Sequence, residues 1–233
     1  MSASEIRSLA RALLDLCKMK KLTIATAESC TGGLVCASLV DIPGSSAVVT
    51  SGFITYSNEA KHEMLGVSTE TLEAFGAVSK EAAVSMAAGA LKIAKSDLTV
   101  AVTGIAGPGG ATPGKPVGLV HLAVAARDGR VVAREKRFGA IGRTQVRMRS
   151  VVEALKMLTE LARGPGKATR VKRPAPGADR SRPRASRTLR QSGGTRPRFI
   201  AQRVPQLCRR LFLGGRDPAV SGQPGADRLA PSG

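Results

Sequence analysis

The chain has 233 residues, enough for one or two domains, with 42% hydrophobic residues and a formal net charge of +19. No apolar run reaches the roughly 18–20 residues of a membrane span, and the N-terminus lacks the charged and apolar regions of a secretory signal, which argues against membrane and secreted proteins. Four cysteines without CxxC spacing and only two histidines argue against a zinc site, so we expect a cytoplasmic protein with reduced thiols and no metal.

Hydrophobic periodicity divides the first part of the chain into alternating helices and strands. In chain order the predicted elements are a helix (4–19), a strand (22–27), a helix (33–40), a strand (48–56), a helix that opens at Ser57 or Asn58, a helix (79–95), a strand (98–103), a hairpin of two strands (117–126 and 131–138) and a helix (143–162). Gly52, inside a strand, is a candidate for a bulge or a close backbone approach. This order predicts an α/β fold: one three-layer α/β/α domain with a mixed sheet over residues 1–163.

The composition changes after Arg163. Residues 164–233 hold 16 of the 36 basic residues, 3 of the 17 acidic residues and 9 of the 13 prolines. Large apolar residues are almost absent until Phe199–Leu213, and Pro205 interrupts that stretch. The composition predicts a disordered basic tail that cannot bury enough surface to offset its ordering entropy.

Two further interpretations of this tail are open. An excess of Arg, Pro, Ala and Gly also arises when GC-rich codons are translated out of frame, so a frameshift or readthrough is one hypothesis, which sequencing the gene would test. Its positive charge would also bind nucleic acid through phosphate groups, without sequence selectivity because aromatic residues are scarce. The alternative is a solvated extension with no partner.

The most informative segment is Ala27–Gly33, because a buried strand precedes it and a helix follows it. A short turn of hydroxyl and glycine residues between strand and helix can point the Ser29 hydroxyl at a substrate. The free N–H groups at the start of the following helix favour an anion or an oxyanion. The simpler alternative is an ordinary helix cap, with the glycines present for the bend.

Three other segments carry candidate groups. Tyr56 and Lys61 follow one strand, Thr103 opens a Gly-rich loop (103–110) after another, and Arg143 begins the last helix. Each of these groups also has a purely structural interpretation. Tyr56 would be a packed side chain, Lys61 a surface residue, and the Gly-rich loop a simple crossover. Arg143 would cap its helix or pair with Glu135 or Glu153.

These groups nevertheless fall at or near the carboxyl ends of predicted strands, the edge at which open α/β sheets bind ligands. No His-based triad is available, so Ser29 with a neutral Lys61 is the hydrolytic combination that the chain offers.

Six motifs occur in one order: Thr26-Ala27-Glu28-Ser29-Cys30-Thr31-Gly32-Gly33, Gly44-Ser45-Ser46, Thr55-Tyr56-Ser57-Asn58-Glu59-Ala60-Lys61, Gly76-Ala77-Val78-Ser79, Thr103-Gly104-Ile105-Ala106-Gly107-Pro108 and Lys115-Pro116-Val117-Gly118. Over about residues 5–162 the chain resembles the CinA C-terminal-domain family, the nicotinamide-nucleotide amidohydrolases. The resemblance implies hydrolysis of nicotinamide mononucleotide (NMN) to nicotinate mononucleotide and ammonia, in a three-layer α/β fold without metal or cofactor.

The resemblance also implies roles for individual residues. Ser29 would be the nucleophile, Lys61 its general base, and Tyr56 an aid to proton transfer. Arg143 would meet the substrate phosphate, and the amides of residues 31–33 would stabilise the oxyanion. The implied substrate-binding residues are Glu28, Thr31, Gly32, Gly33, Ser45, Thr103, Gly104, Gly107 and Arg143.

The chain departs from the family at some points. Ala140 stands where many members have an acidic residue, which leaves the partner of Arg143 open. Many members carry an additional N-terminal domain with pyrophosphatase activity. We do not expect this activity in the present chain. The family is commonly oligomeric, so a homo-oligomer is expected, with no membrane partner. The alternative function is a nucleotide-binding protein of the competence or DNA-damage type, without turnover.

Overall fold

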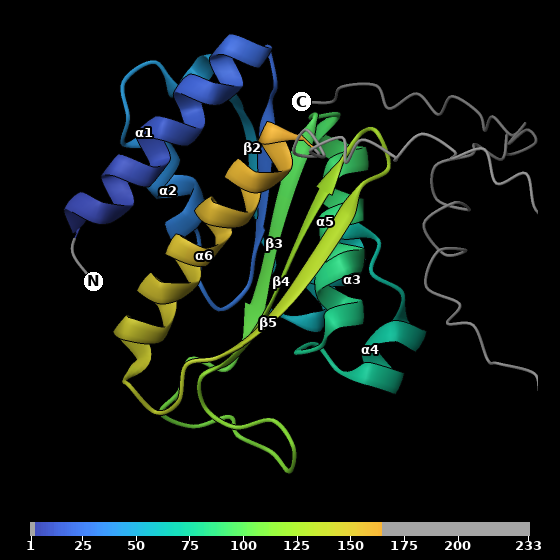
Figure 1. Cartoon of the computed structure of the whole chain (residues 1–233). Helices are drawn as coiled ribbons and strands as arrows, with labels where there is room; N and C mark the ends of the chain where they lie inside the picture. Colours follow the sequence, from blue (N-terminus) through green and yellow to red (C-terminus); the bar gives the residue numbers. More distant parts are fainter. Residues whose placement is uncertain (1–2, 165–233) are drawn as a thin grey trace, which may run out of the picture. The chain divides into compact units, whose positions relative to one another are not determined.

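The computed structural model describes residues 3–164, and the expectations for residues 165–233 lie outside that range (Figure 1). The helices are α1 (Ala3–Lys20), α2 (Leu34–Val40), α3 (Asn58–Leu65), α4 (Thr69–Phe75), α5 (Lys80–Ala94) and α6 (Arg143–Arg163), with a short 3-10 helix at Ser45–Ala47. The strands are β1 (Ile24–Glu28), β2 (Val49–Ile54), β3 (Leu98–Gly104), β4 (Leu119–Ala126) and β5 (Val131–Arg137).

The five strands form one mixed sheet in the order β2-β1-β3-β4-β5. β1 pairs in parallel with both β2 and β3, whereas β4 is antiparallel to both β3 and β5. The inner strands β1, β3 and β4 are buried almost throughout, and the edge strands β2 and β5 alternate between half-buried and exposed positions. Their patterns follow from position, because an inner strand of a covered sheet is apolar on both faces.

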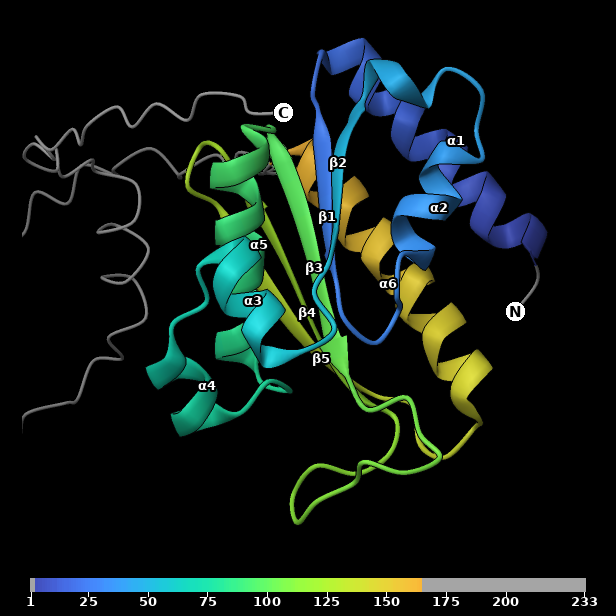
Figure 2. The same ribbon diagram turned by 180° about the vertical axis from the view of Figure 1, so that it is seen from behind.

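Helices cover both faces of the sheet, as Figure 1 and the reverse view in Figure 2 show. α1, α2 and α6 pack together on one face around the larger core cluster, which includes Leu13, Leu39 and Leu155. α5 packs on the other face with α3 and α4 beside it, around Ala87, Met86 and neighbouring small residues. The predicted three-layer α/β fold with a mixed sheet is thus confirmed.

Two local elements differ from prediction. α4 is a seven-residue helix that buries none of its residues, so it has no apolar periodicity by which to recognise it. The 3-10 helix Ser45–Ala47, between α2 and β2, is the other element that is absent from the prediction. Gly52 is a point of close approach, because a Cβ there would be 2.8 Å from the Sγ of the Cys36 side chain.

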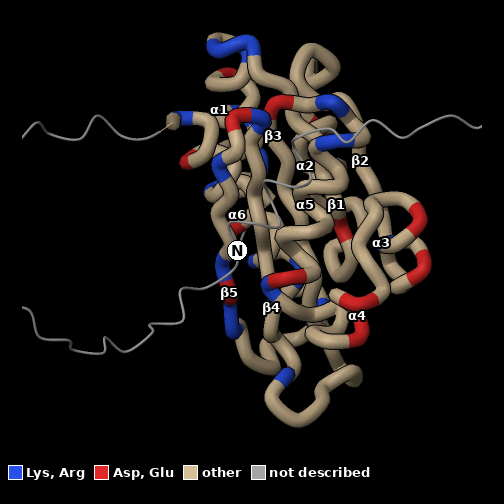
Figure 3. Tube along the Cα trace, turned by 90° about the vertical axis from the view of Figure 1, so that its right-hand side faces the viewer, with Lys and Arg blue, Asp and Glu red and all other residues tan. Residues whose placement is uncertain are grey.

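The parallel pairing brings the carboxyl ends of β1, β2 and β3 to one edge of the sheet. The segments that follow these strands are therefore neighbours in space although they are distant in the sequence. Acidic residues gather on α3 and α4 beside this edge (Figure 3). Among the helices within residues 3–164, none is long and apolar enough to cross a membrane.

Candidate active site

A cavity of about 250 Å³ lies where β1, β2 and β3 end. Its lining comes from five parts of the chain: the residues after β1, the β2–α3 connection with the start of α3, the loop before α5, the end of β3 with the Gly-rich loop that follows it, and the first residue of α6. The lining residues are Ser29, Cys30, Tyr56, Lys61, Ala77, Val78, Thr103, Gly104, Ile105, Ala106, Gly107, Gly109, Gly110 and Arg143.

Ser29 directly follows β1 and is held there by the neighbouring strand. Its backbone N–H donates to the Val102 carbonyl of β3 at 2.9 Å. The chain then turns through Gly32 and Gly33, whose φ angles of +60° and +91° lie in the left-handed region. Residues that carry a side chain rarely adopt this backbone conformation, so the two glycines allow the sharp turn from β1 into α2. The predicted strand, turn and helix are thus present around Ser29.

Lys61 reaches Ser29 from the first turn of α3. Its Nζ lies 3.3 Å from Ser29 Oγ and donates to the carbonyl oxygens of Thr55, Tyr56 and Ser57 at 3.0, 3.2 and 3.2 Å. The Ser57 hydroxyl caps α3 by accepting from the Ala60 N–H, which fixes where the helix begins. Lys61 is only 1% exposed, so the alternative of a solvated surface lysine does not apply.

Burial lowers the pKa of the Lys61 amine from its ordinary value of 10.5, although the Cys30 and Glu59 groups nearby oppose the shift. A neutral amine has two N–H groups and one lone pair. Two of the carbonyl oxygens around Nζ can accept those N–H groups while the lone pair faces Ser29. Once the amine takes a proton, all three carbonyls can accept from the ammonium. The arrangement therefore suits a group that gains and returns one proton.

Tyr56 and Arg143 lie together at the mouth of the cavity. The Tyr56 side chain is 64% exposed, and its hydroxyl accepts from Arg143 Nη2 at 3.3 Å. Arg143 Nη1 donates to the Gly107 carbonyl at 3.1 Å. The alternative pairing of Arg143 with Glu135 or Glu153 is not found: those carboxylates bind other cations, namely Arg137, Arg134 and Lys136.

The loop after β3 forms one wall of the cavity. The Thr103 hydroxyl donates to the Ala77 carbonyl at 2.8 Å, so Thr103 ties this wall to the loop before α5. Gly104 lies against β4, where a Cβ would be 2.7 Å from the Leu119 carbonyl oxygen. Gly107 has a φ of +82° and lies close to Val117. Gly104 is thus required by the nearby backbone of β4, and Gly107 by its backbone conformation and the nearby Val117 side chain, whatever either residue contacts in a ligand.

Five of the residues expected to bind substrate lie outside the lining of the cavity: Glu28, Thr31, Gly32, Gly33 and Ser45. Glu28 is fully buried, and both carboxylate oxygens accept from backbone N–H groups of α2, so its side chain is not available to a substrate. The Gly32 N–H donates to the Ser29 carbonyl at 3.1 Å, which removes it from the expected oxyanion donors. Ser45 is buried in the 3-10 helix before β2.

The structure adds lining residues that sequence reasoning had not assigned to the site. Ala77 and Val78 belong to a motif that carried the family resemblance, but apolar residues in a loop carry no chemical signal. Cys30 follows the candidate nucleophile and is buried, which raises the pKa of its thiol to about 12. The thiol is therefore protonated near neutral pH, and Cys30 contributes packing rather than a second nucleophile.

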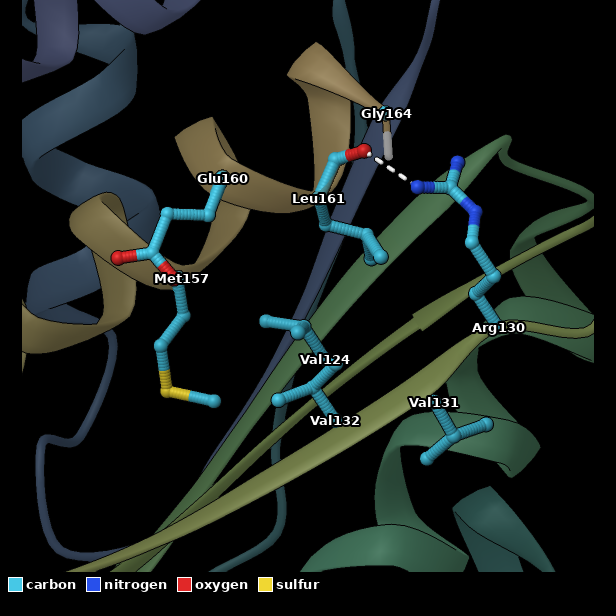
Figure 4. Close-up of a pocket in the computed structure, with 8 residues that line it drawn as sticks. All are labelled: Val124, Arg130, Val131, Val132, Met157, Glu160, Leu161 and Gly164. Carbon is cyan, nitrogen blue, oxygen red and sulfur yellow. Dashed lines mark hydrogen bonds between the residues drawn. The ribbon is translucent and has the colours of Figure 1, made fainter. Parts of the chain in front are cut away.

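A larger cavity of about 310 Å³ lies between the β4–β5 hairpin and the end of α6 (Figure 4). Its lining is mainly apolar, including Val124, Val132 and Met157, and its two charged residues, Arg130 and Glu160, lie on opposite sides of it. Arg130 is engaged, because its Nη1 donates to the Leu161 carbonyl at 2.9 Å. The lining of this larger cavity holds no nucleophile with a base beside it. The smaller cavity beside Ser29 is therefore the better candidate for the active site, although it is not the larger of the two.

Comparison with known proteins agrees with the resemblance. The family model of the CinA C-terminal domain matches residues 6–162. The nicotinamide-nucleotide amidohydrolase PncC of Enterobacter agglomerans is 45% identical over 155 residues, which cover 66% of this chain and 94% of that protein. A CinA-like protein of Chlorobium phaeovibrioides is 46% identical over 167 residues, covering 70% of this chain and 39% of that protein.

Several of the curated relatives are thus much longer than the matched region. The matched region spans 34% of the CinA-like protein of Mycolicibacterium gilvum, at 51% identity over 144 residues that make up 62% of this chain. Among solved structures, the competence/damage inducible protein CihA from Agrobacterium tumefaciens has 55% sequence identity and a TM-score of 0.67, covering 67% of this chain and 95% of that one.

Proposed function

Because the chain belongs to the CinA C-terminal domain family, we propose that it is an amidohydrolase that converts NMN and water to nicotinate mononucleotide and ammonia. The observation that carries the proposal is the pair of Ser29 Oγ and Lys61 Nζ, 3.3 Å apart beside a cavity at the carboxyl edge of the sheet. The Enterobacter agglomerans relative, whose name states this activity, supports it over nearly its whole length.

In the first half of the proposed reaction, Ser29 Oγ attacks the carboxamide carbon while its proton passes to the neutral amine of Lys61. The new C–O bond moves the carbonyl electron pair onto oxygen, giving a tetrahedral oxyanion. When this collapses, the C–N bond breaks and Lys61 returns the proton to the leaving nitrogen, which departs as ammonia. The N–H groups of Thr31 and Gly33 stay proposed donors to the oxyanion.

In the second half, water replaces ammonia at the same position. Lys61 takes a proton from the water as its oxygen adds to the acyl carbon. Collapse of this second intermediate breaks the bond to Ser29 Oγ, and Lys61 returns the proton to that oxygen. The product is the carboxylic acid, which ionises to nicotinate, and the serine is restored.

The phosphate of the proposed substrate is negatively charged, so a cationic side chain at the mouth of the cavity would bind it. Arg143 lines the cavity, is bound there by the Gly107 carbonyl and the Tyr56 hydroxyl, and has no carboxylate partner among the described residues. We therefore propose that Arg143 meets the phosphate. Tyr56, whose hydroxyl accepts from Arg143, is proposed to assist the proton transfer. We also propose that the protein is a homo-oligomer, as the family resemblance implies, and that it is cytoplasmic, as its cysteine usage favours.

The test is the release of ammonia and nicotinate mononucleotide from NMN by the full chain, beside two serine variants. We expect Ser29→Ala to lose at least about 10³-fold in kcat, because the nucleophile is gone, while NMN binding is retained. Ser150→Ala is the matched control: this serine is also buried, but its hydroxyl donates to the Val146 carbonyl within α6. It should keep the wild-type kcat.

Either of two results would count against the proposal. Turnover by Ser29→Ala close to that of the wild type would exclude Ser29 as the nucleophile. NMN binding by a folded wild-type protein without any product would instead favour the nucleotide-binding alternative.

A further inference from the structure

The segment Ser29–Gly33, here called the nucleophile loop, connects β1 to α2. Two of its five residues are glycines, which allow many backbone conformations, yet Ser29 Oγ must stay in reach of Lys61. The α2 helix that follows begins at Leu34, and its N-cap residue, Gly33, supplies no side-chain cap. The first N–H groups of a helix have no partner within the helix, so something else must satisfy them.

Glu28 supplies that partner from the strand before the loop. Its Oε2 accepts from the Val35 N–H at 3.0 Å and its Oε1 from the Cys36 N–H at 2.8 Å, and the residue is 0% exposed. A negative charge at this end of α2 also interacts favourably with the helix dipole. The backbone of Glu28 is fixed in β1, where its carbonyl accepts from the Thr55 N–H at 2.9 Å. One side chain thus links the two ends of the nucleophile loop.

Arg147 of α6 holds the middle of the same loop. Its Nη2 donates to the Thr31 carbonyl at 2.8 Å and lies over Gly32, where a Cβ would be 3.5 Å from this nitrogen. Neither Arg147 nor Glu28 belongs to the lining of the cavity. The nucleophile loop is therefore held at three places. The Ser29 N–H binds Val102 at its start, Arg147 binds its middle, and Glu28 binds the helix at its end.

We propose that Glu28 and Arg147 are positioning residues that hold the nucleophile loop, and with it Ser29 Oγ, in register with Lys61. The inference rests on the proposed amidohydrolase function for its kinetic consequence, but not for its structural one. A displacement of a reacting atom by about 1 Å can cost on the order of 10²-fold in rate. Loosening the loop should therefore lower kcat and leave KM nearly unchanged, because neither side chain lines the substrate cavity.

The chain contains a matched control at the opposite end of β1. Asp97 accepts from the Thr23 N–H at 2.9 Å and from the Thr23 hydroxyl at 2.7 Å, so it is also a carboxylate that binds the backbone beside this strand. It is remote from the cavity lining. Asp97→Asn should lower thermal stability without changing the geometry at Ser29.

The experiment compares the full chain with Glu28→Gln, Arg147→Met and Asp97→Asn. Glu28→Gln keeps the size of the side chain but turns an N–H₂ donor toward an N–H donor of α2. Amide hydrogen exchange, followed by mass spectrometry of peptides, should accelerate in residues 29–36 for Glu28→Gln and not for Asp97→Asn. With NMN as substrate, kcat should fall about 10- to 100-fold for Glu28→Gln and about 3- to 10-fold for Arg147→Met, with KM within about 2-fold.

Unchanged exchange in residues 29–36 of both loop variants would overturn the inference, and so would a rise in KM at unchanged kcat. If Glu28→Gln does not fold, Arg147→Met gives the same test through the other anchor. A wild-type protein that releases no ammonia would contradict the proposed function alone. The exchange measurement would then still decide whether Glu28 and Arg147 hold the loop.

Discussion

Lys61 is the residue whose surroundings differ most from what its position in the sequence suggests. A lysine in the first turn of a short helix usually extends into water, but this one turns back under α3 toward three carbonyl oxygens. Burial lowers the pKa of the Lys61 amine and so favours its neutral form. The three carbonyl oxygens act in the opposite direction, because they accept hydrogen bonds from the ammonium form. Together the two effects bring the neutral and protonated forms of Lys61 closer in free energy than they are for a lysine in water.

This balance predicts the pH dependence of the reaction. Only the neutral amine can take the Ser29 proton, so kcat/KM should rise with pH through one ionisation, at a pH below the ordinary lysine pKa of 10.5. Lys61→Arg stays protonated throughout this range, so it should lose the rise and at least about 10³-fold in kcat. The measurement is the pH profile of NMN hydrolysis for both proteins. A Lys61→Arg protein that keeps more than a tenth of the wild-type kcat would contradict the assignment of Lys61 as the general base.

At the scale of elements, the position of Lys61 depends on how α3 packs against α5. Gly89, in the middle of α5, lies so close to the end of α3 that a Cβ there would overlap the Leu65 carbonyl oxygen. A glycine inside a helix costs about 1 kcal/mol relative to alanine. Here the close contact requires it, because only a residue without a Cβ lets the two helices approach.

Gly89→Ala should therefore destabilise the protein although it improves helix propensity. We expect a net loss of about 1–3 kcal/mol in the free energy of unfolding, since the clash with backbone outweighs the gain of about 1 kcal/mol. It should also lower kcat, because α3 must move and carries Lys61. Ser85→Ala on α5 is the control for propensity alone and should be neutral or stabilising. Thermal unfolding and NMN turnover measure both effects, and an unchanged melting temperature would contradict the packing argument.

The described part of the chain, residues 3–164, contains two core clusters and the lining residues named above for the candidate site. The end of α6 is also satisfied within this range. Lys20 Nζ donates to the Ala162 and Arg163 carbonyls at 2.8 and 2.9 Å, and Arg130 donates to the Leu161 carbonyl. Cations at the carboxyl end of a helix are favourable, so α6 has its own C-terminal partners.

A chain truncated after Gly164 should consequently fold and work like the full chain. We expect kcat and KM for NMN within about 2-fold of the full-length values, since no described site residue is removed. The melting temperature should stay within a few degrees, because no described core residue is lost. A larger drop in either quantity would show that residues 165–233 contribute to the fold or to the site.

Local patterns were enough for most of the secondary structure and for the reactive edge of the sheet. The turn after β1, with its serine and two glycines, is recognisable because left-handed turns and helix starts need particular residues. The carboxyl ends of parallel strands meet at one edge by topology, so Ser29 and Thr103 were expected to be neighbours. The side-chain directions were less accessible, as Glu28 and Lys61 show, because both are polar residues that turn inward to bind backbone groups.

The amino-acid sequence was enough to predict the alternation of strands and helices, the family, and the residue types available for amide hydrolysis. The three-dimensional packing was needed to see that Lys61 lies against Ser29, that Glu28 binds α2 rather than lining the cavity, and that Arg147 contacts the nucleophile loop. The difference arises because patterns of hydrophobicity and turn residues act over a few positions. Contacts such as that between Ser29 and Lys61, 32 residues apart, are set by strand pairing and helix packing across the whole sheet.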